Sequence, residues 1–114
     1  IYGAAAAAEK MTDTVKRCDG RGFVTETVDR NALMRAQTPQ CFKTSLYLAS
    51  AYTAERDGFE ATDDCSVVEH AGFPVKMIDC GKTNLKITTP EDLVIARALL
   101  TARNLTARAA DSHT

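Results

Sequence analysis

Residues Asn84–Leu93, with the sequence NLKITTPEDL, mark the start of a helix. Thr89 is suited to the N-cap, and Pro90 to the first helical position, where a missing N–H costs no hydrogen bond. Asp92, three residues after Thr89, occupies the capping-box position. The preceding residues, Leu85–Thr88, are typical of a short strand. We therefore expect a strand that leads into a capped helix.

Two shorter helices and another strand are predicted upstream. Between residues 43 and about 56, apolar and small side chains recur at helical spacing and stop before Gly58. Asp63 is a good N-cap for a second helix over residues 64–70, which would end by Gly72. Residues 74–79 are typical of a strand. The chain is thus predicted to mix helices and strands.

A β-hairpin is predicted nearer the N-terminus. The tetrapeptide Asp19–Gly22, DGRG, is a turn signal between two alternating segments, Val15–Arg17 and Phe23–Val28. Neither face of the second segment is strongly apolar, and an isolated two-stranded hairpin is marginally stable in water. We therefore expect this hairpin to pack against something outside itself.

The composition is that of an ordinary globular protein. The chain has 114 residues, 45% of them hydrophobic, and a formal net charge of −1. Without a basic surplus we expect neither a nucleic-acid nor a membrane partner, and no run of about 18 apolar residues predicts a membrane span. The 4 cysteines form no Cys-x-x-Cys pair, which argues against zinc and indicates reduced thiols in the cytoplasm.

Five strings, taken in order and spacing, resemble the 2-C-methyl-D-erythritol 4-phosphate cytidylyltransferase family. They are DTVKR at Asp13–Arg17, ETVDR at Glu26–Arg30, RAQTPQ at Arg35–Gln40, TDDCS at Thr62–Ser66 and NLKITTPEDL at Asn84–Leu93. The resemblance runs from about residue 2 to residue 100 but covers the C-terminal half of the family. The family's glycine-rich phosphate loop is not matched, since Gly3–Ala8 lacks basic residues and no predicted strand precedes it. We therefore expect a fragment that is inactive alone.

The resemblance implies an α/β fold, the C-terminal half of a Rossmann-like three-layer nucleotidyltransferase (nucleotide-diphospho-sugar transferase) domain. Residues 1–103 would be this part of the cytidylyltransferase domain, and residues 104–114 a disordered tail. The hairpin, about residues 15–30, would project as a dimerisation arm. The implied partners are CTP, 2-C-methyl-D-erythritol 4-phosphate and a second copy of the chain in a homodimer.

The implied reaction joins CTP and 2-C-methyl-D-erythritol 4-phosphate to give 4-diphosphocytidyl-2-C-methyl-D-erythritol and pyrophosphate, in non-mevalonate isoprenoid biosynthesis. Magnesium would be bound mainly by the nucleotide phosphates and by the unmatched half. Two alternatives stay open. Ribitol-5-phosphate cytidylyltransferases share the TPQ and KITTPED strings, although TVDR together with RAQ favours methylerythritol phosphate. A non-catalytic dimerisation or binding module would explain the missing loop.

Four residues are candidate ligands for the acceptor phosphate. By spacing alone Lys86 is a solvated edge-strand lysine and Arg30 a member of a surface ion pair, but the resemblance implies that both are catalytic and hold this phosphate. Arginine is well shaped for a bidentate grip on phosphate. Thr14 and Thr38 are either ordinary strand threonines or hydroxyl contacts to the same phosphate.

The remaining polar residues are given structural roles. Asp63 and Asp64 are a possible metal pair, but an acidic pair before a short helix is more often a cap, so we predict no metal ligand in this chain. His70 and His113 have no partner spacing that indicates catalysis.

Overall fold

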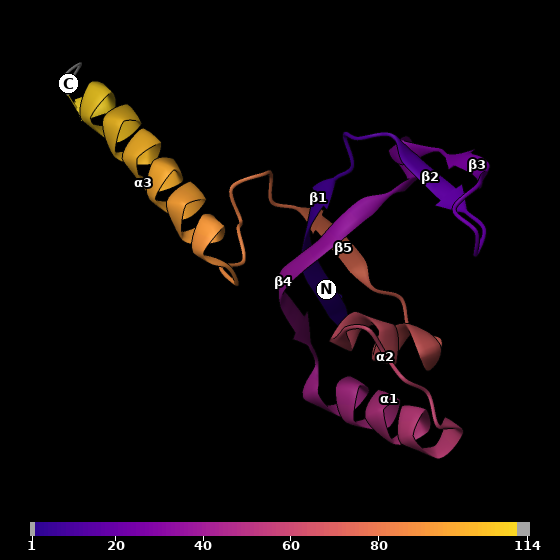
Figure 1. Ribbon diagram of the computed structural model, residues 1–114. Helices are drawn as coiled ribbons and strands as arrows, with labels where there is room; N and C mark the ends of the chain where they lie inside the picture. The colour runs from indigo at the N-terminus through magenta and orange to yellow at the C-terminus, as the bar shows by residue number, and fades with distance from the viewer. Residues whose placement is uncertain (1, 112–114) are drawn as a thin grey trace. The chain divides into compact units, whose positions relative to one another are not determined.

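The computed structural model describes residues 2–111 (Figure 1). The described residues form two compact units, 2–81 and 82–111. The elements of the first unit are β1 Ala4–Lys10, β2 Val15–Cys18, β3 Val24–Val28, the 3₁₀ turn η1 Arg30–Ala32, β4 Met34–Phe42, α1 Thr44–Asp57, α2 Asp64–His70 and β5 Lys76–Asp79. The second unit contains α3, Pro90–Asp111. Among the described residues, no helix is both long and apolar enough to cross a membrane.

A strand of alanines, β1, is the centre of the main sheet. The strand order is β4-β1-β5, with β4 antiparallel and β5 parallel to β1. Ala4, Ala6 and Ala8 are 1%, 2% and 0% exposed, so β1 lies at the core of the unit. The sequence patterns do not predict this strand, because alanine has little β propensity and a run of alanines has no alternation.

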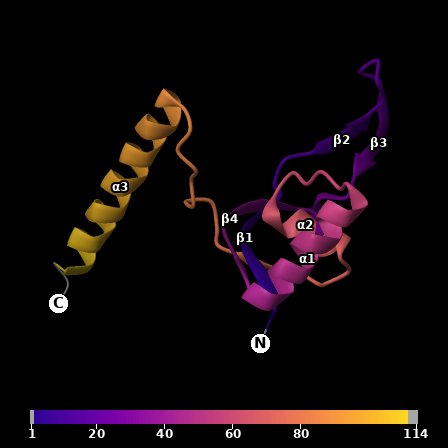
Figure 2. The same ribbon diagram turned by 90° about the horizontal axis from the view of Figure 1, so that it is seen from below.

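Helices α1 and α2 were both predicted, and they lie side by side (Figure 2). Their buried residues are Ser50 and Ala54 of α1 and Cys65 and Val68 of α2. Helix α2 also contacts β1. Gly58, with φ 64°, ends α1 in the left-handed region, and its N–H is donated to the carbonyls of the last turn. The predicted glycine stop is confirmed.

The predicted hairpin is confirmed as a separate two-stranded sheet of β2 and β3. Val15 pairs with Val28, and Arg17 with Glu26, whose side chains form an exposed ion pair of 3.0 Å. The Asp19 carboxylate closes the turn by accepting hydrogen bonds from two backbone N–H groups of residues 21 and 23. Most residues of both strands are exposed.

The second unit confirms the predicted capping box and corrects its surroundings. The Asp92 N–H donates to Thr89 Oγ1 at 3.2 Å, and the Thr89 N–H donates to Asp92 Oδ2 at 3.0 Å. The predicted strand at Leu85–Thr88 is wrong: the segment is irregular, and the Thr88 N–H donates to Asp92 instead of to a neighbouring strand.

Helix α3 also extends further than the sequence analysis predicts. It continues to Asp111, although a frayed tail is expected from residue 104. The sequence NLTARAAD over residues 104–111 is rich in good helix formers, which accounts for the continuation. Residues 112–114 of the predicted tail lie outside the described residues.

Substitution of Ala8 by leucine tests the close packing around β1. Ala8 is fully buried, so Ala8→Leu must displace its neighbours and should lower the free energy of unfolding by about 1–3 kcal/mol. Ala36 pairs with Ala8 but is exposed, so Ala36→Leu is the matched control and should change stability by less than about 0.5 kcal/mol. Urea unfolding measures both. Equal effects of the two substitutions would contradict this packing.

Candidate functional site

One open pocket of the first unit gathers two of the strings singled out in the sequence. Its volume is about 580 Å³. It is lined by Thr38, Pro39, Gln40, Ala61, Thr62, Asp63, Asp64 and Val67. Its walls are therefore the middle of β4 and the first turn of α2 with the residues before it. Of the predicted site residues, Thr38 lies here.

Strand β4 is irregular where it lines the pocket. Ala6 pairs with Gln40 and Ala8 pairs with Ala36, so two steps along β1 face four steps along β4. The extra length contains Thr38, and the Thr38–Pro39 peptide bond is cis. An irregularity of this kind changes the direction of side chains that would otherwise alternate between the two faces of the sheet. Thr38 is a strand threonine, and it is also exposed beside a pocket.

Hydrogen bonds fix the start of α2. Asp63 is the N-cap, and its carboxylate accepts from the N–H of Ser66 at 2.8 Å and from the hydroxyl of the same residue. Bonding to the Ser66 hydroxyl is the main cause that lowers the pKa of Asp63, with smaller contributions from the Ser66 N–H and the Gln40 amide. The predicted capping role of Asp63 is confirmed.

The neighbouring carboxylate, Asp64, also has a protein partner. Tyr47 of α1 donates its hydroxyl to Asp64 Oδ1 at 2.8 Å, and this bond raises the pKa of Tyr47. Within residues 2–111, no group of three or more His, Cys, Asp or Glu side chains is arranged to hold a metal ion.

Arg30 and Thr14 lie at the same end of the hairpin. The Val15–Val28 pair is the last pair of the ladder at the end opposite the turn. Thr14 lies one residue beyond this pair, and Arg30 two residues beyond it. Arg30 begins η1 and donates from Nη1 to the carbonyl oxygen of Thr12 at 2.8 Å, which ties η1 to the segment that leads into β2. Both candidate side chains are exposed.

Lys86 belongs to the second unit, in the irregular segment before α3, and it is exposed. Since this segment is not a strand, its interpretation as an edge-strand lysine is wrong. The next backbone groups, at Thr88 and Thr89, are fixed by the Asp92 carboxylate. That carboxylate accepts several hydrogen bonds, first among them from the Thr88 N–H, and its pKa is lowered.

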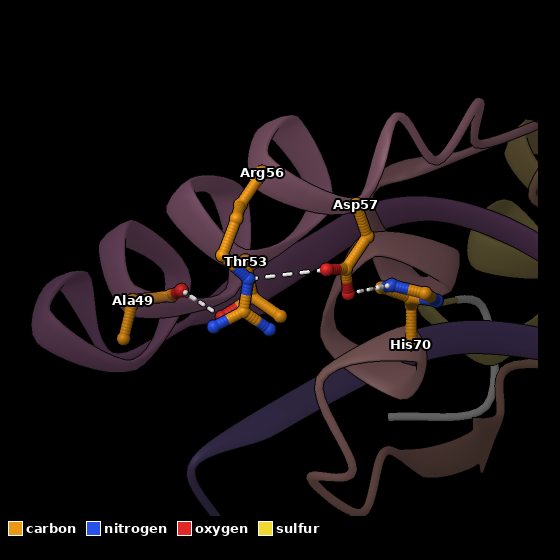
Figure 3. Close-up of polar contacts among 5 residues, drawn as sticks. All are labelled: Ala49, Thr53, Arg56, Asp57 and His70. Carbon is orange, nitrogen blue, oxygen red and sulfur yellow. Dashed lines mark hydrogen bonds and ion pairs between the residues drawn. The ribbon is translucent and has the colours of Figure 1, made fainter.

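His70 joins α2 to the end of α1, and the expectation that it is not catalytic stays a prediction. Its Nε2 lies 2.9 Å from Asp57 Oδ2, and Asp57 also pairs with Arg56 at 3.1 Å, so the ends of α1 and α2 are joined (Figure 3). The His70 ring stacks on Phe59 with centroids 4.1 Å apart. His113 lies outside the described residues.

Thr62 and Gln40 line the pocket with polar side chains but were not predicted as site residues. Both lie in strings quoted for the family resemblance, Thr62 in TDDCS and Gln40 in RAQTPQ. Gln40 lies two residues after Thr38 on β4, and the approach of α2 to β4 brings Thr62 to the same pocket. The quoted strings contained these residues, but local spacing does not reveal that the strings meet.

Comparison with known protein families gives one clear match. The family model described as 2-C-methyl-D-erythritol 4-phosphate cytidylyltransferase matches residues 1–102. A curated protein of this name from Geobacillus thermodenitrificans is 46% identical over 102 residues, which are 90% of this chain and 44% of the relative. One from Desulforamulus reducens is 47% identical over 102 residues, with the same two coverages. The predicted family resemblance is confirmed.

Solved structures agree with the sequence relatives. The 2-C-methyl-D-erythritol 4-phosphate cytidylyltransferase from Thermus thermophilus has a TM-score of 0.71 and 39% identity, over 85% of this chain and 47% of that chain. The 4-diphosphocytidyl-2C-methyl-D-erythritol synthase from Anaerococcus prevotii has a TM-score of 0.78 and 34% identity, over 88% and 47%. The predicted α/β nucleotidyltransferase fold is confirmed, whereas the dimerisation role of the hairpin stays a prediction. The chain spans less than half the length of these relatives.

The cap of α2 should make stability depend on pH. Because the folded-state pKa of Asp63 is lowered, its carboxylate contributes stability above the unfolded pKa of about 3.9, and this contribution is lost as the pH falls through the lower folded pKa. Asp63→Asn keeps an acceptor for the Ser66 N–H but has no charge. Urea unfolding should show wild type more stable than the variant at neutral pH, with the difference shrinking below about pH 4. A difference that is constant down to about pH 2 would contradict this.

Proposed function

Since the chain belongs to the 2-C-methyl-D-erythritol 4-phosphate cytidylyltransferase family, we propose that it supplies the acceptor-binding part of an enzyme with that activity. The enzyme would join CTP and 2-C-methyl-D-erythritol 4-phosphate, give 4-diphosphocytidyl-2-C-methyl-D-erythritol and release pyrophosphate, in the cytoplasm. The observation that carries the proposal is the family match over residues 1–102. Because the relatives are more than twice as long as the matched segment, nucleotide binding would come from the remainder.

The proposed step is an in-line displacement at the α-phosphorus of CTP. An oxygen of the acceptor phosphate forms the new P–O bond while the bond to the bridging oxygen breaks, and pyrophosphate leaves. Such a step depends on positioning and charge neutralisation more than on proton transfer. Arg30 would grip the acceptor phosphate in bidentate fashion, and Lys86 would add a second positive charge. Thr14 and Thr38 would donate hydroxyl hydrogen bonds to the same phosphate.

Several structural facts support these roles. Arg30 and Thr14 share the exposed open end of the hairpin, so both can reach one external ligand. Thr38 opens onto a pocket with an irregular strand behind it. Lys86 is exposed and stands two residues before a backbone segment that a capping box holds in place.

Magnesium would be held mainly by the nucleotide phosphates and by residues beyond this chain. The described residues do not fit a magnesium site of their own, since residues 2–111 contain no cluster of three or more potential ligands. The proposed phosphate contacts therefore use only side-chain charges and hydroxyls, and they need no metal ion bound by this chain. The side chains are those of Arg30, Lys86, Thr14 and Thr38.

The enzyme would act as a homodimer in which the hairpin of each subunit packs against the partner subunit. Phe23 and Val24 near the hairpin tip are 64% and 57% exposed, and a two-stranded ribbon of this kind gains stability when a partner covers it. Arg30 would then act in the site of the partner subunit, and Lys86 in the site of its own subunit.

A segment exchange tests the proposed activity. Residues 1–102 replace the matching 102-residue segment of the Geobacillus thermodenitrificans relative, and pyrophosphate release is measured with CTP and either 2-C-methyl-D-erythritol 4-phosphate or ribitol 5-phosphate. We expect activity with the first acceptor. The 114-residue chain alone is expected to release none. Loss of activity in the exchanged protein, or preference for ribitol 5-phosphate, would overturn the proposal.

In the exchanged protein, Arg30→Ala and Lys86→Ala should each lower kcat/KM for the acceptor by about a hundredfold. One charge-assisted phosphate contact is worth roughly 1.5–3 kcal/mol, and misorientation adds to its loss. Affinity for CTP should change little. Arg17→Ala is the control, because Arg17 is an exposed arginine of the same hairpin whose partner is Glu26. A collapse of CTP binding with unchanged acceptor kinetics would show that the roles are wrongly assigned.

Mixing subunits tests which chain supplies each cation. If Arg30 acts in the partner's site and Lys86 in its own, a mixed dimer of Arg30→Ala and Lys86→Ala subunits contains one site with both residues intact. About half of a dimer's activity should then return after subunit exchange. If both residues serve the same site from one chain, every site stays damaged, and activity does not rise above that of either variant. Differently tagged subunits verify that exchange has occurred.

A further inference from the structure

Gln40 occupies a distinctive place in the pocket, because its carboxamide bonds to three different residues. Its Oε1 accepts the backbone N–H of Cys65 at 3.1 Å. Its Nε2 donates to Asp63 Oδ2 and to the carbonyl oxygen of Gln37, both at 3.2 Å. The first two contacts cross from β4 to the start of α2, and the third stays within β4.

The orientation of this carboxamide follows from its partners. Cys65 N–H is a donor, whereas the Asp63 carboxylate and the Gln37 carbonyl are acceptors. A flipped amide would place its oxygen against the two acceptors and its N–H groups against a donor. The neighbouring groups therefore require an uncharged side chain whose end both donates and accepts hydrogen bonds. Among unbranched side chains of this length, only glutamine meets this requirement.

Resting on the proposed function, we infer that Gln40 is a positioning residue for the acceptor site. Its carboxamide clamps the first turn of α2 against β4, and this clamp keeps Thr38 and Thr62 in the wall of one pocket.

The start of α2 depends on such side-chain bonds. The first N–H groups of a helix have no partner within the helix. In α2, Gln40 satisfies the N–H of Cys65 and Asp63 that of Ser66. Thr62 is tied to the same turn through a 3.3 Å contact between its hydroxyl and that of Ser66. Movement of this turn therefore moves Thr62 relative to Thr38.

The clamp joins the polar pocket to the core. Cys65, whose N–H binds Gln40, has a side chain only 1% exposed, and burial raises its thiol pKa to about 11. Val68, one turn further along α2, is fully buried. The core holds one side of α2, and Gln40 holds the end that faces the pocket. Both N–H groups of the Gln40 amide are occupied by protein acceptors, so we assign it positioning rather than chemistry.

Two substitutions separate the clamp from side-chain size. Gln40→Met has similar length but neither donor nor acceptor of comparable strength. Gln40→Glu keeps an acceptor for Cys65 N–H but brings a second carboxylate beside Asp63, with Asp64 as the other charged group of the same turn. Gln37→Met is the matched control, since Gln37 is also a half-buried glutamine of β4, and its side-chain amide donates to Glu9 on β1.

The first readout is structural and does not depend on catalysis. In the 114-residue chain, Gln40→Met should speed amide hydrogen exchange at Cys65 about tenfold, while Gln37→Met should leave it within about twofold. If Gln40→Met leaves Cys65 exchange unchanged, the clamp is refuted. Hydrogen exchange tests the clamp even if the exchanged protein shows no cytidylyl transfer. Absence of cytidylyl transfer would refute the proposed function and not the clamp.

The second readout is kinetic. In the exchanged protein, Gln40→Met should raise KM for 2-C-methyl-D-erythritol 4-phosphate about tenfold and leave kcat and KM for CTP within about threefold. Gln40→Glu should raise the same KM at least as much, because its carboxylate places a second negative charge beside Asp63 and has no donor for Asp63 or for the Gln37 carbonyl. Equal losses for both substrates in Gln40→Met, or an unchanged KM for the acceptor, would overturn the positioning role.

Discussion

The packing of α2 against a strand of alanines is the constraint on which the first unit depends. Ala6 and Ala8 of β1 are almost completely buried, and so are Cys65 and Val68 of α2. Methyl side chains let neighbouring backbones approach closely, and a protein interior tolerates little added volume. The core is therefore narrow and built from small residues. The position of α2, and with it one wall of the pocket, follows from this close contact.

Side chains, more than regular ladders, complete the hydrogen bonding around the candidate site. Asp63 and Gln40 satisfy N–H groups at the start of α2, and Asp92 satisfies those before α3. Buried or half-buried backbone groups need such partners. The Gln40 contact joins α2 to the strand that contains Thr38, and the Asp92 contacts fix the backbone that follows Lys86. Structural capping and site formation thus depend on the same few polar residues.

The proposed acceptor ligands are distributed over separate parts of the chain. Arg30 and Thr14 lie at the open end of the hairpin, Thr38 in β4, and Lys86 before α3. A phosphate gripped from several elements is oriented as well as neutralised, which an in-line displacement requires. The proposed activity would therefore depend on several elements of the chain. The chain spans less than half the length of its relatives.

Local signals in the sequence determined the hairpin, both short helices with their caps, the start of α3 and the family. Turn residues, N-caps and a glycine in the left-handed region act over a few neighbouring positions, so they can be recognised without a structure. The strings quoted for the family contain Thr38 and Gln40, but they do not show that these residues line one pocket with Thr62. Only the tertiary structure decided that the alanine run is the central strand and that Gln40 reaches α2. It also decided that residues 85–88 form no strand and that the Thr88 N–H donates to Asp92 instead. Those outcomes depend on burial and on partners distant in sequence, which local spacing does not encode.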